Sequence, residues 1–317
     1  MRIGIMIGEV RGPATASDLA AQVTAAAGLA TIWSAQVSGW DALTTLTLAG
    51  TQTAASPSTD TRTAAIRLGT AVVPVRQRHP LTLAGQALSV QAATGNRLTL
   101  GIGAGIGAMV TGMYGLPADR PVRYLREYLS VLHPLLRGES VEHRGESLTA
   151  IGSAAIPGAE APPVLLAALG PKMLQLAGEA TDGTVTWMTG PRALSTHVVP
   201  RITAAAEAAG RAAPQVVAGL PICVTHDEPG ARAQIATRYA MAAQIPEYQA
   251  VLALENATGA GDVAIVGDEA AITRQLQRLE ESGVTEFMAT PFGTPADQSR
   301  TTRLLHALTD AAGRSHP

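Results

Sequence analysis

The chain has 317 residues and a formal net charge of −2, with 46% hydrophobic and 15% charged residues. This composition supplies a large core, and no long run of like charge offers a phosphate-binding surface to a nucleic acid. No apolar stretch approaches the ~20 residues of a membrane span, and the only cysteine, Cys223, excludes an intrachain disulfide. We therefore expect a cytoplasmic protein without nucleic-acid or membrane partners, whose residues 2–7 form a strand and not a signal peptide.

Short apolar runs alternate with helical patterns along the first half of the chain. The clearest helix opens at Pro121, repeats apolar residues at a spacing of three and four from Val122 to Leu136, and closes at Gly138. The expected strands are 2–7, 31–35, 66–73 and 97–102, and the expected helices are about 17–28 with Ser17 as its cap, 41–54 opened by Asp41, 81–93 and 121–138.

The alternation continues in the second half, with two interruptions that we interpret as insertion segments, 139–162 and 229–262. The first is rich in charge, proline and glycine and predicts an irregular excursion or a short hairpin. The second is helical with a break near Pro246, and residues 263–266 form a short strand or coil. The remaining expected strands are 163–168, 183–188, 216–224 and 286–290, and the helices are 171–179, 191–209, 268–283 with Asp268 as its cap, and 298–312.

Eight strand–helix units with few hairpin signals favour parallel pairing. We predict a single domain over residues 1–317, a (β/α)8 TIM barrel with insertion segments, since this fold uses ~250 residues. A doubly wound open sheet is the rival architecture. In the barrel, functional residues lie at the carboxyl ends of the strands.

Two strand ends are unusual. Residues Leu100–Gly107 carry glycine at every second position, but no dinucleotide-binding GxGxxG pattern is present, because Ile106 and Ala108 stand where its last glycine would be. Residues 164–172 pass through small side chains into a helix start at Pro171, where free N–H groups and Lys172 predict an anion site. Both segments indicate a ligand that lies against bare main chain.

The strand ends lack the residues of most catalytic sites. The seven histidines show no metal-ligand spacing, so we expect no metal, and neither a nucleophile elbow nor a P-loop is present. A pocket so poor in acids and bases is typical of a barrel that binds a cofactor and leaves the chemistry to it.

At this point the sequence resembles the bacterial luciferase superfamily, and within it the F420-dependent oxidoreductases of actinobacteria. The likeness covers nearly the whole chain. It is carried by Ile32–Trp33, by Leu68–Pro74 followed by Arg78-His79-Pro80, by Gly95–Gly103, by Ala167–Pro171 and by Asp182–Gly183.

The resemblance implies a luciferase-like barrel that forms homodimers and holds coenzyme F420, a deazaflavin, at the strand ends. It implies a non-proline cis peptide at Ala71–Val72 behind the ring, ring and ribityl contacts at Gly103 to Gly105, and phosphate contacts at Ala167 to Gly170. The expected cofactor-binding residues are Gln36, Ala71, Val72, Val73, Gly103, Ala104, Gly105, Ala167, Ala168, Leu169, Gly170 and Lys172.

The chain departs from the family where relatives often carry a proton donor. Gln36 and Val37 follow the second strand, and Ile106 stands in the glycine loop. Gln36 can form hydrogen bonds but cannot act as a general acid. His79 and Tyr114 are the remaining catalytic candidates, each with a structural alternative. The expected substrate-pocket residues are Trp33, Trp40, Ile106 and Trp187, with core packing as the alternative for the tryptophans.

The sequence therefore predicts hydride transfer between reduced F420 and an activated C=C, C=N or C=O bond of a small organic substrate. One alternative is an FMN-dependent luciferase-like monooxygenase. A second is a barrel that binds the cofactor without catalysis.

Overall fold

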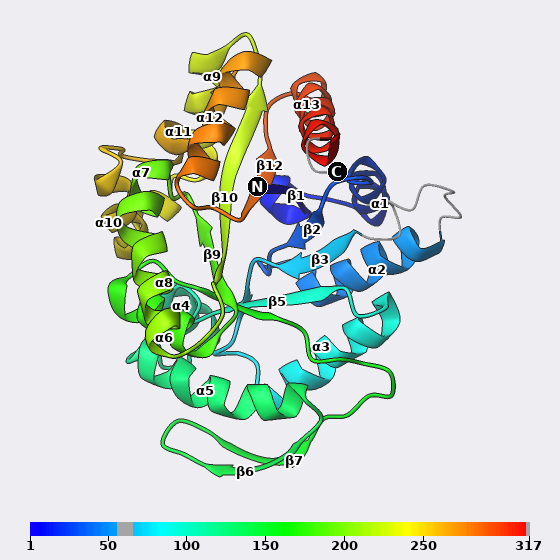
Figure 1. Ribbon diagram of the computed structural model, residues 1–317, viewed down its shortest axis with the longest axis vertical. Helices are drawn as coiled ribbons and strands as arrows, with labels where there is room; N and C mark the ends of the chain where they lie inside the picture. The colour runs from blue at the N-terminus through cyan, green and yellow to red at the C-terminus, as the bar shows by residue number, and fades with distance from the viewer. Residues whose placement is uncertain (56–65, 315–317) are drawn as a thin grey trace.

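The computed structural model describes residues 1–55 and 66–314, and Figure 1 shows parallel strands in the centre with helices around them. Eight strands close into a ring, because β10 pairs with both β9 and β12. The predicted (β/α)8 barrel is confirmed, and the open doubly wound sheet is excluded. In ring order the strands are β1 (Arg2–Ile7), β2 (Thr31–Ser34), β3 (Arg67–Thr70), β5 (Leu98–Gly103), β8 (Val164–Ala167), β9 (Gly183–Trp187), β10 (Gln215–Val224) and β12 (Glu286–Pro291).

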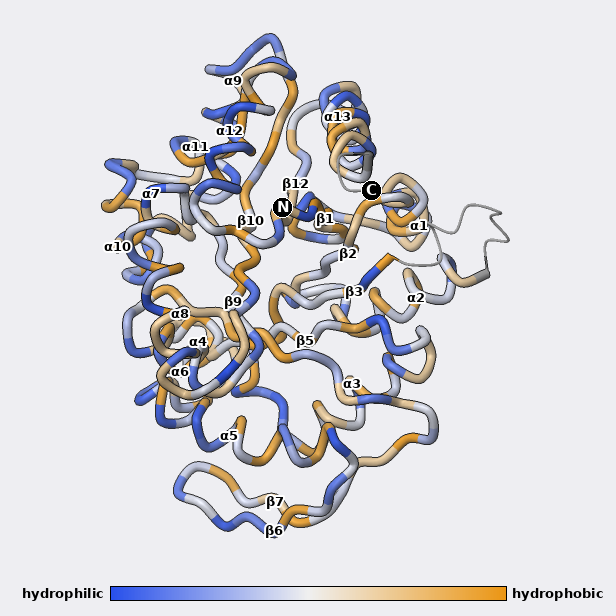
Figure 2. The backbone as a smooth tube through the Cα atoms, in the orientation of Figure 1, coloured by the Kyte–Doolittle hydropathy of each residue, from blue (hydrophilic) through white to orange (hydrophobic). Residues whose placement is uncertain are grey.

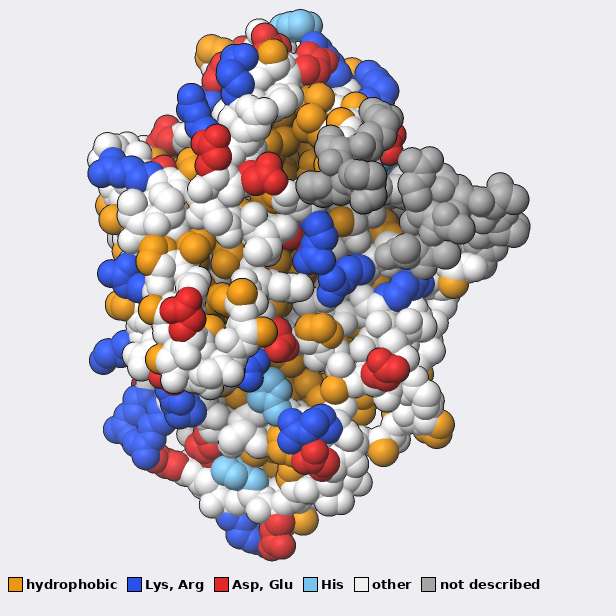
Figure 3. Space-filling view, in the orientation of Figure 1, with side chains coloured by type: hydrophobic (Ala, Val, Ile, Leu, Met, Phe, Trp, Pro, Cys, Tyr) orange, Lys and Arg blue, Asp and Glu red, His pale blue; other side chains and the backbone are white. Residues whose placement is uncertain are grey.

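The covering helices bury one face and expose the other, which Figure 2 shows as alternating orange and blue along α5 and α12. On α12 the buried face consists of Ile272, Leu276 and Leu279. The outer layer contains α1 (Ala16–Ala25), α2 (Ala42–Ala55), α3 (Pro80–Thr94), α5 (Pro121–Leu136), α6 (Pro171–Ala180), α8 (Val199–Ala208), α12 (Glu269–Glu281) and α13 (Pro295–Arg314). Side chains of both charges are spread over the face seen in Figure 3.

The first interruption of the barrel is an antiparallel hairpin, β6 (Ser140–Arg144) and β7 (Thr149–Ser153), beside α5 in Figure 1. The second contains α9 (Glu228–Arg238), α10 (Pro246–Leu254) and α11 (Ala260–Val263). The short strand β11 (Ile265–Gly267) pairs with the end of β10 outside the ring. The helix predicted over 191–209 is divided into α7 (Pro191–Ala193), a π-helical turn (Leu194–Val198) and α8.

Three local predictions were wrong. Thr15, not Ser17, caps α1, because its hydroxyl accepts from the Asp18 N–H while the Asp18 carboxylate accepts from the Thr15 N–H. The third strand is interrupted after Thr70 and resumes as β4 (Val73–Pro74). Helix α4 (Gly107–Tyr114) was missed, since its first residue is preceded by Ile106, which offers no side-chain cap, and two of its residues are glycine.

Candidate functional site

The floor of the barrel mouth is apolar. Met6, Trp33, Leu165, Val185, Val217 and Met288 fill the interior of the ring. Six half-buried residues pack on this cluster from the carboxyl ends of the strands or just beyond them: Val10, Ala35, Ala71, Val72, Ala167 and Trp187. None of these side chains can ionise, so the floor offers a ligand shape and apolar contact but no acid or base.

The bulge after β3 rises against this floor. The peptide bond Ala71–Val72 is cis, as the family resemblance implied. A Cβ on Gly101 would lie 1.9 Å from the Thr70 carbonyl oxygen, and one on Gly103 would lie 3.0 Å from Val72 Cγ2 and 3.3 Å from Ala167 Cβ. Gly101 is therefore required by packing within the barrel. Gly105 is exposed, with φ at +80°, and lies beyond the strand.

Gln36 is held in one orientation beside the bulge. Its N–H donates to the Val72 carbonyl at 3.3 Å, and its Oε1 accepts from the Ala42 N–H at 3.0 Å and from Arg78 Nη2 at 3.3 Å. Arg78 is in turn paired with Asp41. The amide oxygen of Gln36 thus accepts two hydrogen bonds, one for each of its lone pairs. The amide nitrogen, Nε2, forms no hydrogen bond within the described part of the chain and remains free to donate.

The predicted phosphate segment leads into the start of α6. Gly170 precedes the helix with no side-chain cap, and a Cβ there would meet no atom within 4 Å. Ala168 is buried, Leu169 is half-buried with its carbonyl accepting from His197 Nε2 at 2.7 Å, and Lys172 is exposed. Pro171 has no N–H, and the Met173 and Leu174 N–H groups donate to the Gly170 carbonyl at 3.1 and 2.9 Å. Among the first residues of α6, the Lys172 N–H therefore has no acceptor within the described part of the chain, and with its exposed side chain Lys172 can contact an anion.

An aromatic cluster stands at one side of the mouth. The Trp187 and Tyr239 rings meet edge to face at 5.5 Å, and the Tyr239 and Phe292 centroids are 6.4 Å apart. Trp187 was predicted for the pocket, whereas Tyr239 and Phe292 were missed. Phe292 directly follows the eighth barrel strand, so its place in the sequence could have identified it as a residue of the mouth. Tyr239 follows α9 inside an insertion, where no local pattern points to the mouth.

Trp33 does not lie at the mouth, and its prediction as a pocket residue is wrong. Its side chain is 1% exposed, and Nε1 donates at 2.7 Å to Glu286 Oε1, at the amino end of β12. The indole therefore points down into the barrel. Trp40 is half-buried in the loop after β2 and donates from Nε1 to the Ala14 carbonyl at 2.9 Å. Ile106 is 37% exposed at the start of α4.

His79 has a structural task at both ring nitrogens. Nδ1 accepts from the Leu81 N–H at 3.3 Å and caps α3, so the proton is on Nε2, which donates to the Thr149 carbonyl at 2.8 Å. The ring thus ties α3 to the hairpin, and neither nitrogen is left for a proton transfer. Tyr114, at the end of α4, is 45% exposed, and its hydroxyl forms no hydrogen bond within residues 1–55 and 66–314.

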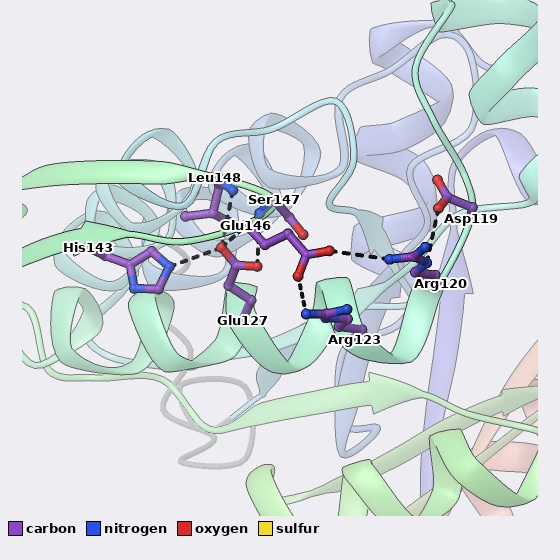
Figure 4. Close-up of polar contacts among 8 residues, drawn as sticks. All are labelled: Asp119, Arg120, Arg123, Glu127, His143, Glu146, Ser147 and Leu148. Carbon is purple, nitrogen blue, oxygen red and sulfur yellow. Dashed lines mark hydrogen bonds and ion pairs between the residues drawn. The ribbon is translucent and has the colours of Figure 1, made fainter.

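A charged cluster beside the hairpin surrounds a cavity of about 380 Å³, and Figure 4 shows its ion pairs. Glu146 pairs with both Arg120 and Arg123. Glu127 accepts from His143 and from two N–H groups of the hairpin turn, at 3.0 to 3.2 Å. The cations of this cluster have partners within the protein, and the contacts attach the hairpin to α5.

Among residues 1–55 and 66–314, no group of three or more metal-ligating side chains lies together. No helix in this part of the chain is long and apolar enough to cross a bilayer.

The geometry agrees with what sequence comparison finds. Residues 1–286 match the luciferase-like monooxygenase family. The chain belongs to this family. The match confirms the family resemblance from which we expected the cis bond. This luciferase-like barrel is therefore a member of an oxidoreductase family.

Among relatives of this luciferase-like protein, a 5,10-methylenetetrahydromethanopterin reductase of Methanolobus tindarius is 31% identical over 180 residues, which are 57% of this chain and 55% of the relative. The chain thus spans about half the length of that relative.

Two solved structures share the fold of the whole chain. The coenzyme F420-dependent tetrahydromethanopterin reductase of Methanopyrus kandleri has a TM-score of 0.72 at 22% identity and covers 96% of this chain and 97% of its own. The oxygenating constituent of 3,6-diketocamphane monooxygenase of Pseudomonas putida, in complex with FMN, has the same TM-score at 16% identity and the same coverage. The fold alone therefore accommodates both cofactors.

Proposed function

We propose that this luciferase-like protein is an F420-dependent oxidoreductase that acts on an activated C=C, C=N or C=O bond of a small organic substrate. The observation that carries the proposal is the floor of the mouth, whose half-buried side chains are apolar and cannot ionise. Relatives named as F420-dependent, including a glucose-6-phosphate dehydrogenase of Mycolicibacterium gilvum that is 29% identical over 173 residues, support the choice of cofactor.

The residues present fit a deazaflavin. Gly103 is buried against Val72 and Ala167, so the half-buried Ala71, Val72 and Ala167 form a surface without long polar side chains, which suits a flat ring. The start of α6, with the Lys172 N–H and side chain, suits a phosphate. Held by these residues, reduced F420 would supply a hydride to the substrate carbon, and solvent would supply the proton that balances the reduction. The further ring contacts, at Ala71, Ala104 and Gly105, and the phosphate contacts, at Leu169, Gly170 and Lys172, belong to the same proposal. Val73 and Ala168, also expected from the sequence, are 0% and 2% exposed and pack in the core, so we do not retain them as cofactor contacts.

The protein's own contribution is positioning and an oriented donor. With Oε1 of Gln36 held by Ala42 and Arg78, its Nε2 can donate to an oxygen or nitrogen that gains negative charge as hydride arrives. Because the Gln36 amide donates hydrogen bonds but does not ionise, it cannot replace solvent as the acid. The apolar walls, including Ile106 and Trp187, exclude water from the reacting carbons.

The test compares the two cofactors on the purified protein by fluorescence titration. We expect F420 to bind at least about tenfold more tightly than FMN. Gly103→Val should weaken F420 binding about tenfold or more, because the new side chain, whose Cβ would lie 3.0 Å from Val72 Cγ2 and 3.3 Å from Ala167 Cβ, displaces these two residues of the floor. Gly112→Val on α4, where a Cβ meets no atom within 4 Å, is the matched control and should bind as the wild type does. Tight FMN binding without F420 binding would overturn the proposal and favour the monooxygenase.

The non-catalytic alternative is tested with the same protein. Reduced F420 is mixed with a panel of enones and imines, and its reoxidation is followed by absorbance. Binding without reoxidation across the panel favours a carrier. The proposal also includes a homodimer in the cytoplasm, as the family resemblance implies. Light scattering on the purified protein and fractionation of the source cells test these two points.

A further inference from the structure

Two arginines at the rim of the mouth have no acidic partner. Arg11 ends a short 3-10 turn (Glu9–Arg11) directly after β1, and Arg238 is the last residue of α9. Neither forms an ion pair within residues 1–55 and 66–314. The nearest acid along the chain, Glu9, is turned away, since its carboxylate accepts from the Gly39 N–H at 2.9 Å.

Arg11 is largely buried although it is a cation. Its Nη2 donates to Gln298 Oε1 at 2.5 Å, and its Nε is buried without an acceptor. Burial lowers the pKa of the guanidinium to about 10, with Tyr239 acting in the opposite direction. Buried cations are normally paired with an anion, because an amide oxygen satisfies one donor but does not neutralise the charge.

Both cations lie close to one hydroxyl group. Tyr239 donates from its hydroxyl to the Val10 carbonyl at 3.0 Å, and Arg238 Nη2 donates to the Glu9 carbonyl at 3.2 Å. Burial raises the pKa of Tyr239 to about 12, while Arg238 and Arg11 act to lower it. The two guanidiniums and the tyrosine therefore share one small region between β1 and α9.

This region borders the proposed substrate pocket. Val10 packs on the floor of the mouth, and Tyr239 is the central ring of the cluster with Trp187 and Phe292. Gln298, the partner of Arg11, donates from Nε2 to the Gly293 carbonyl in the loop after β12. Since β1 and β12 are neighbours in the barrel, the unpaired charge lies at the edge of the mouth beside an aromatic wall.

We propose that Arg11, assisted by Arg238, binds an acidic group of the substrate, a carboxylate or a phosphate, while the apolar part of the substrate lies along Trp187, Tyr239 and Phe292. This inference rests on the proposed function and names its substrate class: an amphipathic acid whose reducible bond is remote from the acidic group. A guanidinium suits this role because it offers five donors and pairs with a carboxylate or phosphate through two of them.

The first experiment compares, as hydride acceptors, a cyclohexenone that carries a carboxylate at the end of an alkyl chain and the neutral methyl ester of the same compound. We expect Arg11→Gln and Arg238→Gln to lower kcat/KM for the acid, Arg11→Gln by about 10- to 100-fold, and to leave the ester nearly unchanged. For each variant, kcat/KM for the acid is divided by kcat/KM for the ester, and this ratio is compared with that of the wild type. The comparison removes the difference in intrinsic reactivity between the acid and the ester. Arg274→Gln, an exposed arginine on α12, is the matched control and should keep the wild-type ratio.

A second experiment needs no F420, so it separates failure of this inference from failure of the proposed function. Inorganic phosphate and acetate are titrated into the cofactor-free protein during thermal unfolding. One of the two anions should stabilise the wild type more than it stabilises Arg11→Gln, and its identity distinguishes a phosphate from a carboxylate site. Phosphate that binds at the start of α6 stabilises both proteins equally, so only the difference between them reports on Arg11. Arg11→Met should unfold at the wild-type temperature or above without an anion, because it removes an unpaired buried charge.

Three results would overturn the inference. The first is an acid-to-ester ratio that Arg11→Gln does not change. The second is a loss of F420 affinity in Arg11→Gln with the ratio preserved, which would assign the cation to the cofactor. The third is a marked fall in the unfolding temperature of Arg11→Met, which would make Arg11 a structural cation.

Discussion

The contact between Gly101 and Thr70 makes Gly101→Ala a severe substitution, although it adds only one methyl group. The new Cβ would lie 1.9 Å from the Thr70 carbonyl oxygen and 3.2 Å from Val72 Cγ1. Backbone cannot rotate away as a side chain does, so β3 and β5 must separate. The hydrogen bond from the Thr70 hydroxyl to the Gly101 carbonyl, at 2.7 Å, is then lost.

Overpacking of this kind costs about 3 kcal/mol, and the lost hydrogen bond adds about 1 kcal/mol. A chain of 317 residues has an unfolding entropy of about 0.7 kcal/mol/K. The unfolding temperature should therefore fall by about 6 °C, measured by circular dichroism or calorimetry. Gly85→Ala in α3 is the matched control, because a Cβ there meets no atom within 4 Å. It should stabilise the protein by about 0.5–1 kcal/mol, since alanine is the better helix former. Equal unfolding temperatures for Gly101→Ala and the wild type would refute the packing argument.

Three further substitutions test other assignments. His79→Ala should lower stability by about 1 kcal/mol and leave kcat within about threefold of the wild type, whereas a loss of 100-fold or more would restore His79 as a catalyst. Burial acts to raise the pKa of Glu127, but hydrogen bonds from His143 and the hairpin outweigh it and lower the pKa from 4.5. The stability that the ionised carboxylate contributes is thus present above pH 4.5 and is lost as the pH falls through the lowered pKa of the folded state. Glu127→Gln should therefore be less stable than the wild type at pH 7, and the difference in stability should shrink in acid. Trp33→Phe should cost about 2 kcal/mol in urea unfolding, because the buried Glu286 carboxylate loses its indole donor; an unchanged midpoint would contradict this.

The sequence alone determined the order of the elements and the barrel fold, and it predicted the end of the barrel at which we propose the site. Strands and helices follow from apolar spacing along the chain, and Pro121, Asp268 and Gly138 marked helix ends because capping chemistry is local. The cis bond at Ala71–Val72 came from the family resemblance, which carries information that no spacing contains.

Only the tertiary structure decided what each side chain does at that end. Trp33 meets Glu286, 253 positions away, and becomes a core residue, while Arg11 meets Gln298, 287 positions away, and retains an unpaired charge. Closure of the ring places β1 beside β12 and sets these pairs. Local periodicity encodes which face a residue occupies but not which distant residue it meets there. The partners of Gly101, His79 and Arg11 were therefore beyond the reach of the sequence.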